Sequence, residues 1–215
     1  MRYSLSINRH HHDKTVGNKK HYRDGFKTQE LTIEELAKAV KQGFAWSCAT
    51  YDRSMRSKAN YQQAQLIGLD IDNGLTLDDA LNHPFVQQYG QLIYTSASHQ
   101  KSKEDTQACD RFRIVFSASQ PINDLDTYEQ LVRAVMGHFP SADDSCKDAS
   151  RYWAGNSQAE IFILDGDPLP ASLIDQAKEQ AKLEWEAREK RRQETLARVK
   201  KQNLDELKTL ALKLK

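Results

Sequence analysis

The chain lacks long apolar runs and is poor in cysteine. No apolar stretch among its 215 residues approaches the length needed to cross a membrane. Residues 1–7 alternate like a strand and have neither the apolar core nor the small-residue cleavage site of a signal peptide. The three cysteines, Cys48, Cys109 and Cys146, are far apart and form no C-x-x-C motif, so neither a disulfide framework nor a cysteine zinc site is supported. We therefore expect a soluble, cytoplasmic protein with no bound zinc and no membrane partner.

The sequence also has no excess of charge of either sign. Its 31 lysines and arginines almost balance its 30 aspartates and glutamates, for a formal net charge of +1. Any nucleic-acid binding must therefore come from a local basic patch. The length allows one large domain, or one domain and a tail. Because residues 171–215 are dense in charged residues, we expect a domain over residues 1–170 and a long charged helix, an extension or linker, after it.

Residues 66–74, Leu-Ile-Gly-Leu-Asp-Ile-Asp-Asn-Gly, combine an apolar run with two carboxylates one residue apart. Side chains on a strand alternate between faces, so Asp70 and Asp72 share one face while Ile67 and its alternate neighbours face the core. Two aligned carboxylates suit Mg²⁺ or Mn²⁺, which leave coordination positions open for substrate phosphates. Taken alone, the pair is equally typical of a strand that runs into an ordinary Asp-Asn-Gly turn.

The rest of the chain mixes strand and helix patterns. Further strands are predicted at residues 3–7, 44–50, 91–95, 111–116 and 160–164, with a break in the chain at residues 120–121. Helices are predicted at residues 32–43, 76–84, 124–139 and 171–201, with an interruption of the last at residues 203–205. The histidines at positions 10–12 are predicted to lie in a surface loop, because consecutive positions converge poorly on a metal. This order predicts an α/β or α+β sheet with helices packed on it.

Three polar segments follow the two acids in chain order. Ala97-Ser98-His99 forms a small-x-His turn, and Arg111-Phe112-Arg113 lies in an alternating strand that places its two arginines on one face. A late polar loop carries Asp143, Asp144, Lys147, Asp148 and Arg151. Carboxylates can hold divalent ions, and the histidine and arginines can neutralise triphosphate oxygens. Nucleotidyl transfer requires this set of groups.

These motifs resemble the archaeo-eukaryotic primase (AEP) superfamily, and within it the primase-polymerase branch of plasmids, phages and mobile elements, over about residues 30–165. Its first motif, Asp-x-Asp after an apolar strand, matches Asp70 and Asp72, and its second matches Ala97-Ser98-His99. Its third motif, a lone acid, falls on Asp143, with the adjacent Asp144 as the rival. The resemblance implies Asp70, Asp72 and Asp143 as catalytic and metal-binding residues, and His99, Arg111, Arg113, Lys147 and Arg151 as nucleotide-binding residues.

The same resemblance implies a fold and an activity. The fold would be an RRM-like catalytic sheet packed against a smaller α/β unit. The activity would be the synthesis or extension of primers on single-stranded DNA from dNTPs or NTPs, with Mg²⁺ or Mn²⁺ in a two-metal site. The partners would be a template, a primer strand and a nucleotide, and the C-terminal helix could lead to a helicase or accessory domain.

Two other functions remain open at this level. A haloacid-dehalogenase-like phosphatase shares an Asp-x-Asp after an apolar strand, a strand ending in Thr95-Ser96 and a late Gly166-Asp167. That family, however, expects Thr or Val where Gly74 stands, and a further acid where Pro168 follows. A non-catalytic replication protein could bind single strands through the same basic residues, although acids in the site would repel phosphates.

Overall fold

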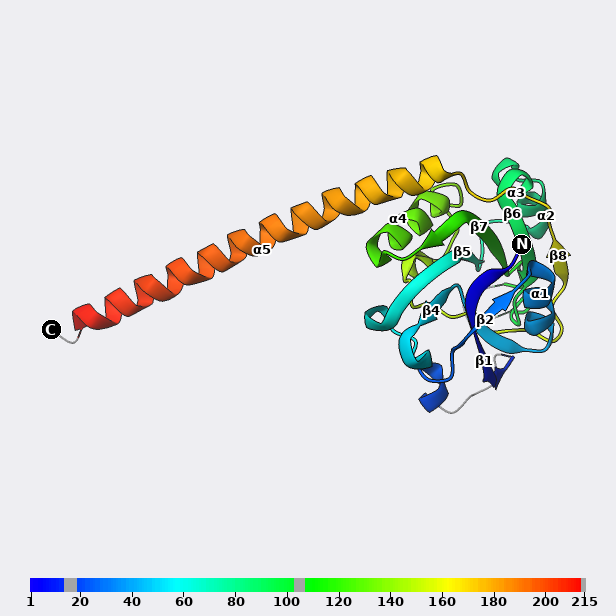
Figure 1. Cartoon of the computed structure of the whole chain (residues 1–215), viewed down its shortest axis with the longest axis horizontal. Helices are drawn as coiled ribbons and strands as arrows, with labels where there is room; N and C mark the ends of the chain where they lie inside the picture. The colour runs from blue at the N-terminus through cyan, green and yellow to red at the C-terminus, as the bar shows by residue number, and fades with distance from the viewer. Residues whose placement is uncertain (14–18, 103–106, 214–215) are drawn as a thin grey trace.

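The structure is a computed structural model that describes residues 1–13, 19–102 and 107–213. Within these residues the chain forms two antiparallel sheets with helices around them (Figure 1). The larger sheet has the order β4-β5-β7-β6-β8, with β4 (Ala49–Tyr51), β5 (Tyr61–Ile71), β6 (Gly90–Thr95), β7 (Phe112–Ile122) and β8 (Ile161–Ile163). The smaller sheet has the order β2-β1-β3, with β1 (Tyr3–His12), β2 (Lys27–Leu31) and β3 (Phe44–Ser47). The helices are α1 (Ile33–Lys41), α2 (Leu77–Leu81), α3 (Pro84–Tyr89), α4 (Leu125–Met136) and α5 (Ala171–Lys213), and the short 3-10 turns are η1 (Lys19–Tyr22), η2 (Asp52–Ser54), η3 (Lys58–Asn60) and η4 (Asp144–Lys147).

The predicted α+β architecture, with a larger sheet, a smaller unit and a long C-terminal helix, is confirmed. Local signals in the sequence set several of the helix starts. Thr32 and Glu35 form the predicted capping box at α1, with the Glu35 carboxylate accepting from the Thr32 N–H at 2.8 Å. Thr76 caps α2 by accepting from the Asp79 N–H at 3.0 Å. The domain boundary expected after residue 170 stays a prediction.

One face of the central strands packs on α3 and the end of α4. Ile67 of β5 lies opposite Phe116 of β7 in the antiparallel register. The Phe116 ring contacts Phe85 of α3 at a centroid distance of 5.4 Å and Phe139, just after α4, at 5.8 Å. Ile67 is fully buried, as the alternation predicts. This aromatic packing lies on the face of the sheet opposite the side chains of Asp70 and Asp72.

The other face of β5 requires a glycine beneath a tryptophan. A Cβ atom at Gly68 would lie 2.8 Å from the Trp153 indole, closer than atoms pack. We therefore expect Gly68→Ala to lower the free energy of unfolding by about 1–3 kcal/mol, because the indole must shift out of a packed core. Urea denaturation measures the change, with Gly137→Ala, at an exposed position after α4, as the control expected to stay within about 0.5 kcal/mol. An unchanged urea midpoint for Gly68→Ala would contradict this packing.

The predicted surface loop at the three consecutive histidines is wrong, because β1 extends through His12. The pairing of β1 with β3 continues past an irregularity between Asn8 and His12. His10 stacks on His21 with ring centroids 4.4 Å apart, and His11 is 3% exposed. The strand β1 therefore continues through the three histidines, whose imidazole rings pack on other rings although the segment is polar in sequence.

Several predicted bounds also differ. The run at residues 44–50 divides into β3 and β4, which belong to different sheets. β7 continues through Pro121, because the β5–β7 register shifts between Ala64 and Leu66 and an irregular ladder tolerates a residue without an N–H. Pro84, where the second helix was expected to end, instead begins α3, since proline is favoured in the first helical turn.

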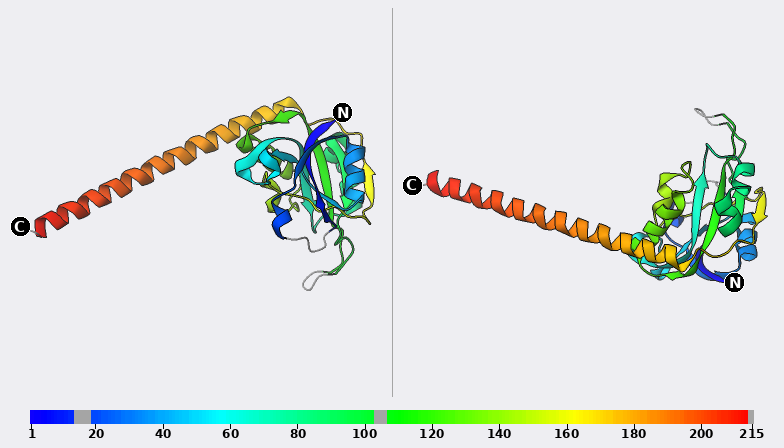
Figure 2. Two further views of the ribbon diagram at one scale, coloured as in Figure 1. Left: turned by 60° about the horizontal axis from the view of Figure 1, so that its bottom comes forward. Right: turned by 90° about the horizontal axis from the view of Figure 1, so that it is seen from above.

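α5 is continuous, so the interruption predicted at residues 203–205 is wrong; asparagine and aspartate lower helix propensity only slightly. α5 packs on α4 and β7, its residues Ile174 and Ala177 are buried, and Arg188 forms an ion pair with Asp126 at 2.7 Å. Beyond this contact the helix extends away from the rest of the molecule (Figures 1 and 2). No helix in the described ranges has the length and apolar character needed to cross a membrane.

Candidate active site

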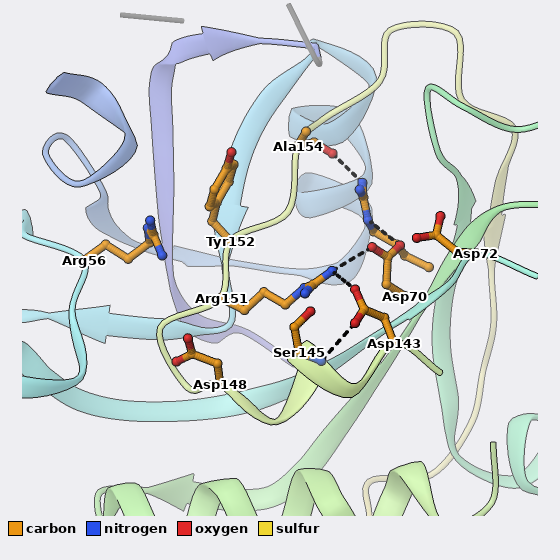
Figure 3. Close-up of a pocket in the computed structure, with 10 residues that line it drawn as sticks. Arg56, Asp70, Asp72, Asp143, Ser145, Asp148, Arg151, Tyr152 and Ala154 are labelled. Carbon is orange, nitrogen blue, oxygen red and sulfur yellow. Dashed lines mark hydrogen bonds and ion pairs between the residues drawn. The ribbon is translucent and has the colours of Figure 1, made fainter. Parts of the chain in front are cut away.

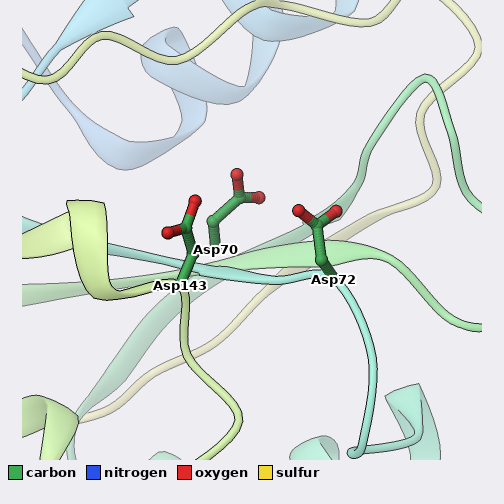
Figure 4. Close-up of side chains that lie close together, drawn as sticks. All are labelled: Asp70, Asp72 and Asp143. Atoms are coloured by element: carbon green, nitrogen blue, oxygen red, sulfur yellow. The ribbon is translucent and has the colours of Figure 1, made fainter.

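Three carboxylates, which we call the acidic triad, converge at the end of β5. Asp70 is the penultimate residue of the strand and Asp72 follows the strand, so alternation turns both to one side. Asp143 comes from a segment beside the strand end: its N–H donates to the Asp70 carbonyl at 2.9 Å, and Ile71 and Ala142 form an antiparallel bridge. One oxygen of each carboxylate lies within 4.8 Å of the other two (Figure 4). Backbone pairing thus joins acids that are distant in the sequence.

Of the two adjacent late acids, Asp143 joins the triad and Asp144 points elsewhere. Asp143 caps η4, where its Oδ1 accepts from the Ser145 N–H at 2.9 Å. The Asp144 side chain is 81% exposed and pairs with Lys147. The structure therefore brings Asp143, and not its rival Asp144, to Asp70 and Asp72, and it places Lys147 beside Asp144 instead of beside the triad.

Two arginines face the triad from opposite sides. Arg113 of β7 places Nε 3.2 Å from Asp70 Oδ1, and its Nη1 donates to the Ala154 carbonyl at 2.7 Å. Arg151 donates from Nη2 to Asp70 Oδ2 and to Asp143 Oδ2, both at 2.9 Å (Figure 3). Both oxygens of Asp70 therefore face a guanidinium group.

Arg113 and Asp143 stay charged although both are partly buried, because neighbouring groups stabilise their charged forms. Burial acts to lower the pKa of Arg113, but Tyr94 and the Asp70 carboxylate raise it above its ordinary value. Burial acts to raise the pKa of Asp143, but hydrogen bonds from Ser145 and the Arg151 guanidinium hold it below its ordinary value. At neutral pH the site therefore combines an ionised Asp143 with ionised arginines.

Two thiols contact the backbone of the acids, and the sequence analysis missed both contacts. The Asp70 N–H donates to Cys146 Sγ at 3.2 Å, and Cys109 Sγ donates to the Asp72 carbonyl at 3.4 Å. Burial raises the pKa of Cys146 to about 12, so it stays a neutral thiol. No spacing rule for cysteines indicates such contacts, because they depend on the fold bringing distant loops to the end of β5.

The Arg111 guanidinium supports a neighbouring loop, and the expectation that Arg111 shares a face with Arg113 stays a prediction. The strand β7 begins at Phe112, and the Arg111 carbonyl before it accepts from the Ser96 N–H at 2.9 Å. Arg111 is 1% exposed, and its Nη1 donates to the carbonyls of Ser98 and Lys101 at 2.8 and 2.6 Å. Its guanidinium thus satisfies loop carbonyls instead of facing the triad.

His99 belongs to the same loop. Its Nδ1 accepts from the Arg111 N–H at 3.2 Å, and its Nε2 lies 3.8 Å from Asp110 Oδ1. The turn before it does border the triad, because a small cavity of about 50 Å³ is lined by Asp70, Asp72, Ser96, Ala97, Ser98, Arg113, Ala154 and Gly155. The small-x-His turn therefore contributes its first residues to the site and its histidine to the loop behind it.

A larger pocket of about 450 Å³ also borders the triad (Figure 3). It is lined by Arg56, Asp70, Asp72, Arg113, Asp143, Ser145, Asp148, Arg151, Tyr152 and Ala154. Arg56 is held by the protein itself: it donates to the Tyr22 carbonyl at 2.9 and 2.7 Å, and its guanidinium lies 4.8 Å from the Tyr152 ring centroid. The volume falls in the range of small-molecule sites, and the lining suits a charged, phosphate-bearing ligand.

No protein-family model matches the chain, and no curated protein matches its sequence. Among solved structures, the chain is similar to the AEP domain of the primase-polymerase (PrimPol) of cyanophage S-2L, with 14% identity and a TM-score of 0.45. The match covers 82% of this chain and 87% of that chain. A likeness of this strength does not assign the chain to a family.

Proposed function

We propose that the chain is a cytoplasmic primase-polymerase of the plasmid, phage and mobile-element type, which makes or extends primers on single-stranded DNA by nucleotidyl transfer. The observation that carries this proposal is the convergence of Asp70, Asp72 and Asp143 to within 4.8 Å beside a pocket of about 450 Å³. The sequence motifs around these acids, which resemble those of the archaeo-eukaryotic primase superfamily, support the same reaction.

The donor set of the triad fits Mg²⁺ or Mn²⁺. All three groups are carboxylates, the hard oxygen ligands that these ions prefer, and Asp70, Asp72 and Asp143 would hold the ions. When bound, such ions supply Lewis acidity that activates a primer hydroxyl and stabilises the leaving pyrophosphate. The protein's own task is then to position the acids, the primer end and the triphosphate.

The two arginines have different proposed roles. Arg113 is anchored on the Ala154 carbonyl, so it orients the Asp70 carboxylate. Arg151 lines the open pocket with 21% of its side chain exposed, so it would donate to the phosphate oxygens of a dNTP or NTP.

The other predicted nucleotide-binding residues, His99, Arg111 and Lys147, bond to groups outside the acidic triad. His99 and Arg111 would act through the loop that they stabilise, next to the small cavity beside the triad. Lys147 would contact a nucleotide only after leaving Asp144. Their direct contacts with nucleotide stay predictions.

Both alternatives fit the site less well. A phosphatase of the haloacid-dehalogenase type would need Asp70 to attack phosphorus. Asp70 is 8% exposed, and guanidinium groups on both of its oxygens draw away the electron density that an attack requires. A non-catalytic single-strand binder would gain nothing from a triad that repels phosphates.

The experiment that tests the proposal compares three activities of the purified full chain in Mn²⁺. With a single-stranded template and labelled dNTPs or NTPs, we expect labelled primers or extended primer strands. Release of phosphate from small phosphoesters without strand synthesis would favour the phosphatase instead. Binding of single strands with neither activity would favour the binding protein. Running the dNTP and NTP reactions side by side also identifies the preferred sugar.

A further inference from the structure

Arg151 occupies the oxygens that a metal ion would need. A single nitrogen, Nη2, donates to Asp70 Oδ2 and to Asp143 Oδ2, each at 2.9 Å. These two carboxylates belong to the triad, and Figure 3 shows the guanidinium reaching between them. A divalent ion shared by Asp70 and Asp143 would have to bind next to a cation that already holds the same pair of side chains.

The rest of the Arg151 side chain is weakly attached. Within the described part of the chain, the Nε atoms of Arg151 and Arg113 are both buried without a hydrogen-bond partner, although Arg113 Nε lies 3.2 Å from Asp70 Oδ1. Its guanidinium lies over the Trp153 ring at 4.9 Å, and 21% of the side chain is exposed in the pocket. Arg113, by contrast, is 12% exposed and is anchored on the Ala154 carbonyl. Arg151 is therefore the arginine of the two that can leave the acids without abandoning a backbone partner.

We propose that Arg151 is a displaceable internal cation that competes with divalent metal ions for Asp70 and Asp143. This inference rests on the metal site of the proposed function. In the metal-free protein, Arg113 and Arg151 together offset two of the three negative charges of the triad. Arg151 must move off Asp70 and Asp143 before both can bind an ion, because two cations on the same oxygens repel strongly.

Displacement leaves Arg151 within the pocket of about 450 Å³ that it already lines. A guanidinium released there can form paired hydrogen bonds with phosphate oxygens, which match its geometry. One residue would thus weaken metal binding in the absence of nucleotide and become available to a triphosphate when the ion is bound. Metal and nucleotide binding would favour one another, because each removes a cost of the other.

The first test measures Mn²⁺ affinity without nucleotide, by the electron paramagnetic resonance signal of free Mn²⁺. We expect Arg151→Gln to bind Mn²⁺ about tenfold more tightly than the wild type, because the competing cation is gone. Lys147→Gln removes the same charge from the same loop, but its ammonium pairs with Asp144, so its affinity should stay within about threefold. Arg151→Lys, which keeps a cation near the acids, should resemble the wild type.

A second test follows Arg151 in the wild-type chain, with a folded Arg151→Gln variant as its control. The guanidinium lies over Trp153, so titration with Mg²⁺ should change tryptophan fluorescence as Arg151 moves away. The other two tryptophans add their own signal: Trp185 is 58% exposed on α5, and Trp46 is buried with its ring centroid 6.2 Å from that of Trp153. The change should be absent in Arg151→Gln.

The outcomes separate this inference from the proposed function. Equal or weaker Mn²⁺ binding by a folded Arg151→Gln, or Mg²⁺ binding by the wild type without a fluorescence change, would overturn the role of Arg151 and leave the metal site intact. Absence of Mn²⁺ binding by both the wild type and Arg151→Gln would overturn the metal site, and with it the proposed function.

Discussion

Asp143→Asn should lower the rate of nucleotidyl transfer about 1,000-fold, whereas Asp144→Asn should leave it within about threefold of the wild type. The first change removes a charged member of the triad, and the loss of several kcal/mol of metal-supplied stabilisation corresponds to about a 1,000-fold lower rate. The second removes an equal charge from a side chain that is 81% exposed and paired with Lys147.

This pair of variants is well matched, because the residues are adjacent and the chemical change is identical. Initial rates of primer extension in Mn²⁺ measure both, and thermal unfolding shows whether each variant is folded. Equal losses in the two variants would mean that the carboxylates act through general charge and not through the triad. A larger loss for Asp144→Asn would exchange the roles of the two acids.

Arg113→Met should lower the free energy of unfolding by about 3 kcal/mol. The Arg113 side chain is 12% exposed, and its removal leaves the Asp70 carboxylate without its β7 partner and the Ala154 carbonyl without a donor. Removing one partner of a buried ion pair is costly because the other charge stays buried. Urea denaturation of the metal-free protein measures the loss.

The double variant Asp70→Asn/Arg113→Met provides the control. If the cost comes from the Asp70 carboxylate, which then keeps only Arg151 as a partner, neutralising Asp70 as well should restore at least about half of the lost stability. Additive losses in the double variant would indicate that Arg113 stabilises the protein through packing and the Ala154 contact instead.

Elements of the fold that short-range sequence patterns specify were predicted correctly. The capping box at Thr32, the buried face at Ile67 and the long charged α5 depend on short-range patterns, and the structure contains all three. The extension of β1 through His12 was missed because ring stacking between histidines and distant aromatic residues leaves no periodic trace. The continuation of β7 through Pro121 was missed because a register shift in a neighbouring strand is invisible in the local pattern.

The candidate site divides in the same way. The sequence indicates Asp70 and Asp72 because both lie at the end of one apolar strand. It cannot choose between Asp143 and Asp144, because that choice depends on a backbone hydrogen bond from Asp143 to Asp70. The alternating pattern of residues 111–116 does not indicate that the Arg111 guanidinium donates to the carbonyls of Ser98 and Lys101, because those contacts depend on how the neighbouring loop folds.

Long-range contacts account for the rest of the site. The bridge from Arg151 to Asp70 spans 81 positions, and the contact from Cys146 to the Asp70 N–H spans 76. No local pattern encodes such pairs, since they form only when the late loop folds against the end of β5. The sequence indicates only that the late loop, with its acids, lysine and arginine, has the residue types of a functional site. It does not show which of these residues contact Asp70.

The central claim is that the acidic triad performs template-directed nucleotidyl transfer. Incorporation of one nucleotide opposite each of the four template bases, in Mn²⁺, tests it most directly. The wild type should add the complementary nucleotide in each case, and a folded Asp72→Asn variant should add none. Incorporation that ignores the template base, or that proceeds equally in Asp72→Asn, would contradict the claim.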